Sequence, residues 1–306
     1  MKKMSEGKKM WLSVMVLFFF YAAFFIIFDD FDRRSAEPLI ESRDWHLILG
    51  AGIVMTFLGF MLYRYSKRMD ERISRDQAAK ENLMRRELTQ NIAHELKTPV
   101  ASILGFTDTI LENPGISMEI RQQFVERTNA QARRLTALLQ DLSTLNKMDY
   151  APDLLVMERV DVSVLVADII KEISIPLEKR QMKLNNCLQQ GIWVTGNWSL
   201  LYSIFRNLIT NAILYAGTGT TIDISVQNRE NDWLFTVSDN GVGVSPEHLP
   251  RLFERFYRVD KGRSRSLGGT GLGLSIVKNA VLWHGGTISV SNNPDGGLCF
   301  VFNLPK

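Results

Sequence analysis

The sequence predicts a multi-domain membrane protein with two transmembrane helices, a helical hairpin that pairs into a dimeric four-helix bundle, and an α+β sandwich. Three observations lead to this fold class. Two uncharged apolar stretches occupy residues 11–28 and 45–63. Two helices with a narrow apolar stripe follow, at about residues 66–111 and 118–148. The remaining residues, 150–306, alternate helical and strand patterns, which favours a mixed sheet with helices on one face.

The two apolar stretches each have about the length of a helix that crosses a bilayer, on the order of 20 residues. Both are apolar on all sides, which favours lipid over a protein core as their surroundings. A cleaved signal peptide is the alternative for the first stretch. Asp29 and Asp30 follow it where small residues would be expected, so a retained helix is favoured. The expected order is a cytoplasmic N-terminus (1–10), a span (11–28), an external loop (29–44), a second span (45–63) and a linker helix (64–84).

Charge predicts the orientation of these segments. Basic residues flank the spans on one side, and acidic residues dominate the loop between them, so the positive-inside rule places the N-terminus and all residues after the second span in the cytoplasm. The protein is therefore expected in the cell membrane as a multi-pass protein. The net charge of +3 is small, and its basic excess beside the lipid membrane indicates anionic lipid and no nucleic acid. The basic residues are Lys2, Lys3, Lys8, Lys9, Arg64, Lys67, Arg68, Arg72 and Arg75.

The external loop, 29–44, is too short to bury a core of its own. A separate extracellular sensor domain is therefore not expected. We expect the spans and this loop to sense an envelope-associated event. A partner membrane protein that does the sensing is the alternative.

The helical hairpin is predicted from apolar residues at alternating four and three spacing. One long helix is expected from about residue 66 to 111, with a kink at Pro99. Asn113-Pro114-Gly115 predicts the turn, and a second helix follows at 118–148. Burying both stripes takes two hairpins in a homodimeric four-helix bundle. The stripes are Ile92, Leu96, Pro99, Ile103, Phe106 and Ile110, then Phe124, Thr128, Gln131, Leu135, Leu138, Leu142 and Leu145.

His94 lies off this stripe, two residues from Ile92 and from Leu96. At about 100° per residue its side chain points nearly opposite the apolar face. Thr98 lies one turn further on the same face as His94. A neutral imidazole is nucleophilic at physiological pH, and the adjacent Glu95 can take or orient the other ring proton. A single exposed histidine is usually plain surface, but the complete string HELKTP favours a nucleophile.

In the C-terminal part, periodicity predicts the individual elements. The expected helices are 161–180, with Asp161 or Ser163 as its cap, and 198–215. The expected strands are 183–188, 192–195, 221–227, 233–238, 287–291 and 298–304. His284 precedes a glycine pair and is expected to be a turn residue.

Three motifs in this part indicate a site for a phosphorylated ligand. Asn207 and Asn211 are four residues apart on one helix face, and amide oxygens suit a hard cation such as Mg²⁺. Asp239 ends a predicted buried strand and precedes Gly241 and Gly243, which let backbone approach a ligand closely. The glycine-rich run 268–273 precedes a helix, and such loops bind phosphate through backbone amides.

In this order, the strings HELKTP, NLITN, DNGVG and GGTGLG resemble those of a two-component sensor histidine kinase, of the type that has a short loop and senses within the membrane. The resemblance covers about residues 66–306. It implies a dimerisation and histidine phosphotransfer domain at 85–149 and a Bergerat (GHKL) ATP-binding domain at 150–306. It also implies ATP and Mg²⁺ as cofactors. ATP would phosphorylate His94, in cis or in trans across the homodimer, and the phosphoryl group would pass to an aspartate of a cognate response regulator.

The same resemblance assigns expected roles to single residues. Asn211 is the direct Mg²⁺ ligand, Asn207 a phosphate neighbour, and Asp239 the acceptor of the adenine amino hydrogen. Thr98 positions water for dephosphorylation of the regulator, so a regulator phosphatase activity is also expected. The glycine-rich loop contributes Gly269, Thr270, Gly271, Leu272 and Gly273.

Residues 244–267 are expected to form a mobile lid over ATP. Similarity to the family suggests that its aromatics, among them Phe253, dock on the hairpin. The basic residues are candidate phosphate contacts, with a solvated basic loop as the alternative. They are Arg258, Lys261, Arg263 and Arg265.

Two departures from the family pattern keep rival functions open. Leu214 replaces a frequent basic residue, and Asn197 replaces a frequent acid. One rival is a Bergerat-type ATPase that uses ATP binding as a clamp. The other is a kinase-inactive phosphatase or scaffold.

Overall fold

The computed structural model describes residues 44–151, 153, 155–260 and 269–306, with the isolated residues Ala22, Ile26, Asp30 and Arg34. It divides into two compact units, Met1–Arg86 and Glu87–Lys306. The expected N-terminus, almost all of the first span, most of the external loop, lid residues 261–267 and Gly268 of the glycine-rich run lie outside the described residues. The second unit contains the hairpin and the α+β domain.

Helix α2 (Asp44–Glu112) includes the expected second span and linker helix, so both segments are helical as predicted. No helix in the described part of the chain has both the length and the apolar character of a membrane-crossing helix. The membrane location of the two spans therefore stays a prediction. α2 continues through Pro99, and the expected kink there stays a prediction as well.

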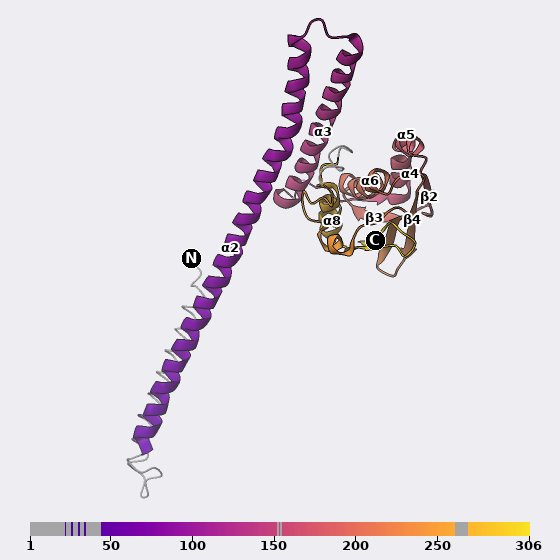
Figure 1. Cartoon of the computed structure of the whole chain (residues 1–306). Helices are drawn as coiled ribbons and strands as arrows, with labels where there is room; N and C mark the ends of the chain where they lie inside the picture. Colours follow the sequence, from indigo (N-terminus) through magenta and orange to yellow (C-terminus); the bar gives the residue numbers. More distant parts are fainter. Residues whose placement is uncertain are drawn as a thin grey trace. The chain divides into compact units, whose positions relative to one another are not determined.

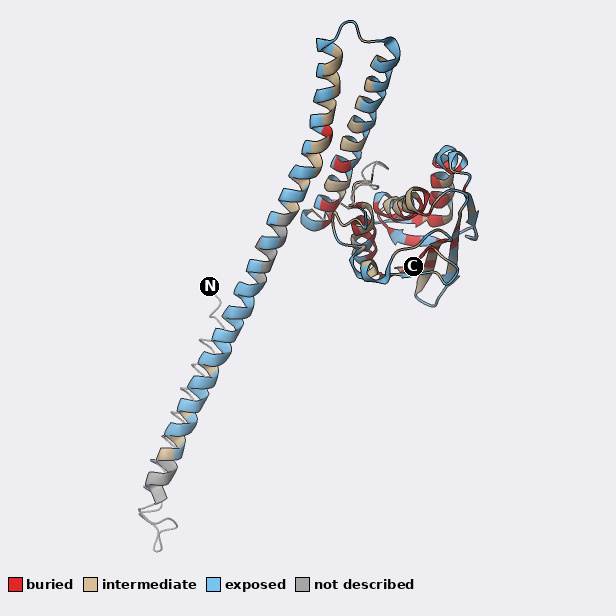
Figure 2. Ribbon diagram, viewed as in Figure 1, coloured by how far each residue is buried: buried red, intermediate tan, exposed pale blue. Residues whose placement is uncertain are grey.

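The hairpin pairs the C-terminal part of α2 with α3 (Met118–Tyr150) (Figure 1). The side chain of Ser117 caps α3 by accepting a hydrogen bond from the Ile120 amide. The two predicted stripes face each other, with Phe106 stacked on Phe124 at 5.5 Å between ring centroids. Figure 2 shows the buried and half-buried positions along the facing sides of the two helices. The four-three spacing thus predicted the hairpin correctly.

The C-terminal domain is a two-layer α+β structure. Its sheet has the order β2-β4-β5-β7-β6, with β2 and β4 parallel and the other pairs antiparallel, which confirms the expected mixed sheet. The strands are β2 (Lys183–Asn186), β4 (Thr221–Asn228), β5 (Asp232–Asp239), β6 (Ile288–Asn292) and β7 (Leu298–Pro305). The main covering helices are α4 (Val162–Glu172), α6 (Trp198–Tyr215) and α8 (Gly273–Trp283).

Three phenylalanines form the centre of the core between helix and sheet. Phe205 of α6 meets Phe235 of β5 and Phe302 of β7 with centroid distances of 5.3–5.5 Å. All three are almost completely buried, and such aromatic pairs add to the area they bury. α6 has the predicted bounds and core face, because its apolar residues recur at helical spacing over its full length.

The single helix expected at 161–180 is wrong. The chain forms α4 and then α5 (Ser174–Lys179), with a break at Ile173. Pro176 has no amide hydrogen, and in a continuous helix its ring would clash with the carbonyl four residues earlier. The expected cap is correct, since the Asp161 carboxylate accepts hydrogen bonds from two backbone amides at the start of α4.

Strand β1 (Glu158–Asp161) was not predicted. Because of it, the expected strand 192–195 lies outside the main sheet. β1 pairs antiparallel with β3 (Trp193–Gly196) in a separate two-stranded sheet. Only Val160 of β1 is buried, so the segment has no alternation that sequence reasoning could detect. A 3-10 helix, η2 (Pro246–Arg251), follows the main sheet's β5.

His284 is more than the turn residue that was expected. It lies at the end of α8 with 6% of its surface exposed. Its Nδ1 lies 2.7 Å from the Ala280 carbonyl, and its Nε2 accepts the Asn197 amide hydrogen at 3.0 Å. Because a carbonyl only accepts, Nδ1 carries the proton and the ring is neutral. The histidine thus joins the end of α8 to the start of α6.

The stability of this domain is expected to fall as the pH drops below about 6.5, the ordinary pKa of histidine. Burial lowers the pKa of His284, so the unfolded chain binds its proton more readily than the folded one. The stabilisation by the neutral His284 ring is complete at pH values above the pKa of this group in the unfolded chain. It is lost as the pH falls toward the lower pKa in the folded protein. Thermal melting as a function of pH should show a smaller slope for His284→Gln, which cannot be protonated. Equal slopes for both proteins would contradict the assignment.

Candidate functional site

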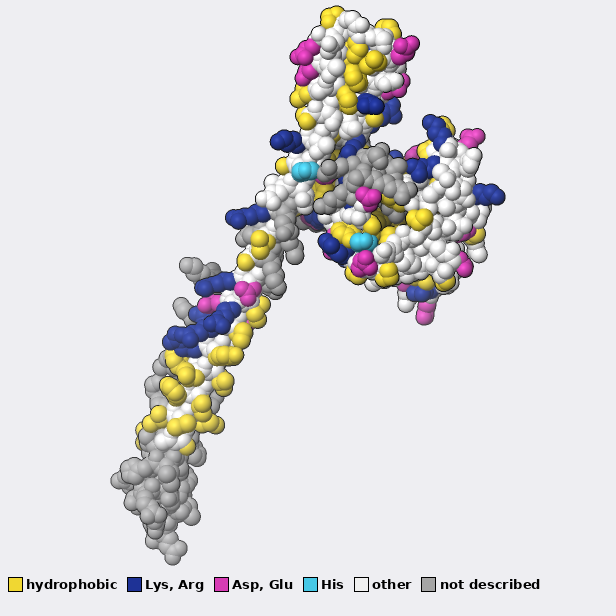
Figure 3. Space-filling model, viewed as in Figure 1, with side chains coloured by type: hydrophobic (Ala, Val, Ile, Leu, Met, Phe, Trp, Pro, Cys, Tyr) yellow, Lys and Arg dark blue, Asp and Glu magenta, His cyan; other side chains and the backbone are white. Residues whose placement is uncertain are grey.

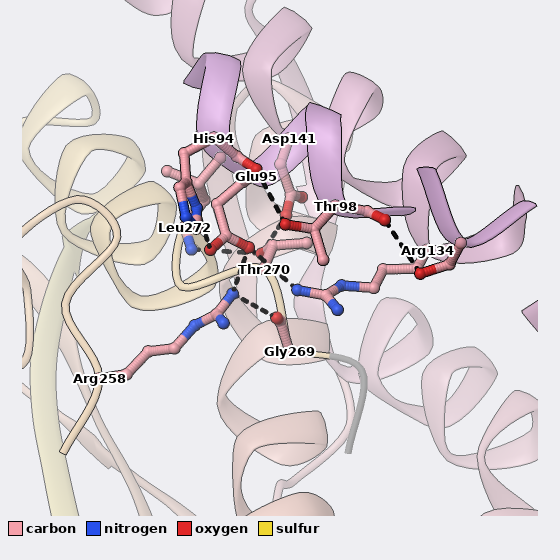
Figure 4. A network of polar contacts seen from close by, with 10 residues as sticks. His94, Glu95, Thr98, Arg134, Asp141, Arg258, Gly269, Thr270 and Leu272 are labelled. Atoms are coloured by element: carbon pink, nitrogen blue, oxygen red, sulfur yellow. Dashed lines mark hydrogen bonds and ion pairs between the residues drawn. The ribbon is translucent and has the colours of Figure 1, made fainter. Parts of the chain in front are cut away.

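His94 lies on the exposed side of α2, as the spacing predicted, and 63% of its side chain is accessible. The Thr98 hydroxyl donates a hydrogen bond to the His94 carbonyl at 3.2 Å. On the opposite side of the helix Pro99 is buried in the hairpin. The imidazole is therefore accessible to a reactant while its backbone is held by the packed hairpin. Figure 4 shows His94, Glu95 and Thr98 together on α2.

Glu95 is held by two guanidinium groups. Its Oε2 accepts from Arg134 at 2.9 Å and from Arg258 at 3.3 Å. The distance from Glu95 Oε1 to His94 Nδ1 is 3.9 Å, which exceeds hydrogen-bond range. In this arrangement the carboxylate is an ion-pair partner of the arginines, and its action as a proton acceptor for His94 stays a prediction.

The two expected cation and phosphate residues lie on α6. Asn197 caps this helix by accepting the Leu200 amide hydrogen. A Cβ at Gly273 would meet Asn207 Oδ1 at 2.9 Å, so the start of α8 lies directly against Asn207. Asn211 is half-buried one turn further along α6. Its amide oxygen is a hard donor that fits Mg²⁺, and the role of both asparagines stays a prediction.

Asp239 ends β5 with 7% of its surface exposed. Its Oδ1 accepts the Gly241 amide hydrogen at 2.9 Å. Burial raises the pKa of Asp239, and the backbone amides of Gly241 and Leu298 oppose this rise. A Cβ at Gly241 would lie 2.3 Å from the Ala216 carbonyl oxygen, so only glycine lets this loop pack against the end of α6. Gly243 follows in the same loop.

The glycine-rich loop leads into α8. Gly271 has a φ of +74°, a conformation that favours glycine, and its carbonyl accepts the Phe256 amide hydrogen at 2.8 Å. The Leu272 amide donates to the Thr270 hydroxyl at 3.2 Å. α8 begins at Gly273, and no side chain of the described residues caps its first turn. Uncapped amides at a helix start are suited to an anion.

Two of the candidate lid residues, Phe253 and Arg258, make different contacts. Phe253 packs on Phe300 of β7 at 6.3 Å between centroids, and its docking on the hairpin stays a prediction. Arg258, with 6% of its side chain accessible, also donates to the Gly269 carbonyl at 2.6 Å. It therefore joins the glycine-rich loop to Glu95, and a phosphate contact from it stays a prediction.

Sequence reasoning missed the residues of α3 that face the nucleotide domain. These are Asp141, which accepts from the Thr270 hydroxyl at 2.7 Å, and Asp149, which pairs with Arg255 at 2.8 Å. Arg134 of α3 was missed as well, and it pairs with Glu95 within the hairpin. Arg134 and Asp141 are seven residues apart, so they share a helix face beside the apolar stripe. That spacing was the available signal, but the partners lie up to 129 residues away in sequence.

Comparison with known proteins gives two matching families. Residues 84–151 match the His Kinase A (phospho-acceptor) domain, and residues 196–306 match the histidine kinase-, DNA gyrase B- and HSP90-like ATPase family. The sensor-like histidine kinase SenX3 of Mycolicibacterium smegmatis is 34% identical over 222 residues, which are 72% of this chain and 58% of SenX3. The phosphate regulon sensor protein PhoR of Haemophilus influenzae is 35% identical over 222 residues, covering 72% of this chain and 52% of PhoR.

A solved structure shows the same fold. The crystal structure of histidine kinase ThkA in complex with response regulator protein TrrA has a TM-score of 0.57 at 20% identity, covering 72% of this chain and 61% of that one. This chain spans about half the length of the curated relatives that it matches. The phospho-acceptor hairpin and the ATPase domain occur here in the order expected from the motifs. On this evidence the chain belongs to the two-component sensor histidine kinases.

Proposed function

We propose that the protein is an ATP-dependent protein-histidine kinase that phosphorylates its own His94. One observation carries this proposal: Arg258 contacts both Glu95, next to the exposed histidine, and Gly269 of the glycine-rich loop. The acceptor helix and the predicted phosphate loop therefore lie within the span of one side chain. An ATPase clamp would not need this juxtaposition.

The reaction that fits these residues is an in-line transfer of the γ-phosphoryl group. A neutral nitrogen of His94 forms the new P–N bond while the bond from the γ-phosphorus to the bridging oxygen breaks, and ADP leaves. The ring nitrogen that does not attack carries the one N–H proton, and Glu95 can accept that proton once it moves closer than its present 3.9 Å. Mg²⁺ bound at Asn211 would neutralise phosphate charge. The transfer depends mainly on positioning and charge.

Leu214 replaces a frequent basic residue, so the kinase-inactive phosphatase or scaffold stays the alternative. In the fold, the guanidinium of Arg180 donates to the Leu214 carbonyl oxygen at 3.4 Å.

The proposed partner is a cognate response regulator whose aspartate receives the phosphoryl group from His94. ThkA was solved in complex with response regulator protein TrrA. In this chain the accessible His94 face is the proposed surface for a regulator. A homodimer is proposed because several large apolar side chains of the hairpin remain exposed in the single chain. They include Val100, Leu104, Ile120, Val125 and Leu139. Thr98 remains the candidate for regulator dephosphorylation.

We place the chain in the cell membrane, with its N-terminus and kinase domains in the cytoplasm. A run of exposed apolar side chains on α2 supports this proposal (Figure 3). Basic residues follow it. Sensing would occur through the spans and the short loop, with a partner membrane protein as the alternative. Extraction of the full chain from washed membranes should require detergent, and release by salt alone would contradict a spanning anchor. The apolar residues are Ile53, Val54, Met55, Phe57, Leu58, Met61 and Leu62.

Incubation of the detergent-solubilised full chain with Mg²⁺ and γ-labelled ATP tests the proposed function. The expected product is protein-bound label that is labile in acid and stable in alkali, as a P–N bond requires. ATP turnover without such label would favour the clamp. Dephosphorylation of a regulator without self-labelling would favour the phosphatase.

A further inference from the structure

Three polar contacts between described residues join the hairpin to the nucleotide domain. In each of the three the acid belongs to the hairpin and the hydrogen-bond donor to the nucleotide domain. The pairs are Glu95 with Arg258, Asp141 with Thr270, and Asp149 with Arg255. Of these donors only Thr270 belongs to the glycine-rich loop (Figure 4). Asp141 therefore places a carboxylate at the loop that is proposed to hold phosphate.

The surroundings of Asp141 are those that a phosphate would require. The Thr270 hydroxyl donates to its Oδ2 at 2.7 Å, and the positive charge of Arg206 favours its ionised form. α3 packs against α8, whose first turn has no cap from any side chain that the structure describes. A hydroxyl donor, a guanidinium and a helix start are groups that bind phosphate oxygens in proteins.

The Thr270 hydroxyl cannot serve both anions at once. A threonine hydroxyl has one hydrogen to donate, and here it is donated to Asp141. Burial raises the pKa of Asp141, which shows that its charge is poorly solvated where it lies. A triphosphate brings more charge and more acceptor oxygens than one carboxylate, so it is the stronger competitor for the loop.

We propose that Asp141 is an intramolecular competitor of the nucleotide phosphates, which holds the glycine-rich loop on the hairpin until ATP displaces it. This inference rests on the proposed function, since it requires the loop to bind phosphate. By linkage, the factor by which ATP weakens the Asp141–Thr270 contact equals the factor by which that contact weakens ATP binding. Removing the carboxylate should therefore tighten ATP binding.

The test is calorimetric binding of Mg²⁺ with a non-hydrolysable ATP analogue to the full chain in detergent. Asp141→Asn keeps an acceptor oxygen but no charge, whereas Asp141→Ala removes both. We expect affinity to rise in the order wild type, Asn, Ala, with a gain of about fivefold or more for Ala. Adenosine, which has no phosphates, should bind equally to all three proteins.

Asp149→Asn is the matched control. This substitution removes one negative charge from the same interface, but Arg255, the partner of Asp149, lies outside the glycine-rich loop. The affinity for the ATP analogue should therefore change by less than about twofold, which is below the typical range of coupling factors. Equal tightening by the Asp149 and Asp141 variants would overturn the competition and indicate general release of the domain. Unchanged affinity in both Asp141 variants, with melting near that of the wild type, would also overturn it. A wild-type chain that binds no analogue would instead contradict the proposed function itself.

Discussion

Replacing His94 by Gln is expected to abolish incorporation of phosphate from ATP while nucleotide binding remains unchanged. Glutamine is similar in size and polarity but has no nucleophilic imidazole nitrogen. The side chain is 63% accessible, and the hydrogen bond from Thr98 goes to the backbone carbonyl rather than to the ring. The substitution should therefore leave the hairpin intact. Acid-labile label, together with calorimetric binding of an ATP analogue, measures the two properties separately.

His248→Gln is a suitable control for this experiment. His248 lies in η2 and contacts the Tyr257 hydroxyl, outside the hairpin that carries the acceptor. This variant should still incorporate label. Full labelling of the His94 variant would show that another residue accepts the phosphoryl group.

Replacing Asp239 by Asn is expected to weaken ATP binding by on the order of 100-fold. A binding site that accepts a hydrogen bond from its ligand loses this much affinity or more when the acceptor is removed, because buried polar groups are then left unpaired. The amide retains one oxygen for the Gly241 amide hydrogen, which the carboxylate accepts at 2.9 Å. Its nitrogen is a donor where the adenine amino group would need an acceptor.

The expected loss should appear as weaker binding of the ATP analogue, with a melting temperature close to that of the wild type. Asp232→Asn is a matched control, because Asp232 lies at the other end of β5 and accepts from Asn303. Near-equal ATP affinity for wild type and Asp239→Asn would remove Asp239 from the adenine site. A large fall in melting temperature would instead assign it a structural role.

Several features of the fold follow from the sequence because they depend on near neighbours along the chain. α6 has its predicted bounds, since its apolar residues recur over 18 residues at helical spacing. The β4–β5 hairpin and the closing pair β6–β7 show the alternation of half-buried strands. The exposed position of His94 follows from the helical period as well, because His94 is two residues from Ile92 and from Leu96 of the apolar stripe.

Local patterns also explain the errors. The break at Ile173 depends on one proline inside an otherwise periodic segment. β1 has a single buried residue, so its pairing with β3 left no periodic trace. His284 precedes two glycines and therefore resembles a turn, although its ring is bonded to the start of α6.

The sequence by itself determined the two family domains, the acceptor histidine as a candidate, and the order of the nucleotide motifs. Only the tertiary structure decided that Glu95 pairs with Arg134 and Arg258, and that Asp141 takes the Thr270 hydroxyl. The physical reason is the separation of these residues along the sequence. Periodicity and turn chemistry report on residues three or four apart, whereas these contacts join residues separated by 39 to 163 positions. Such pairs exist only after segments that are distant in sequence have packed together.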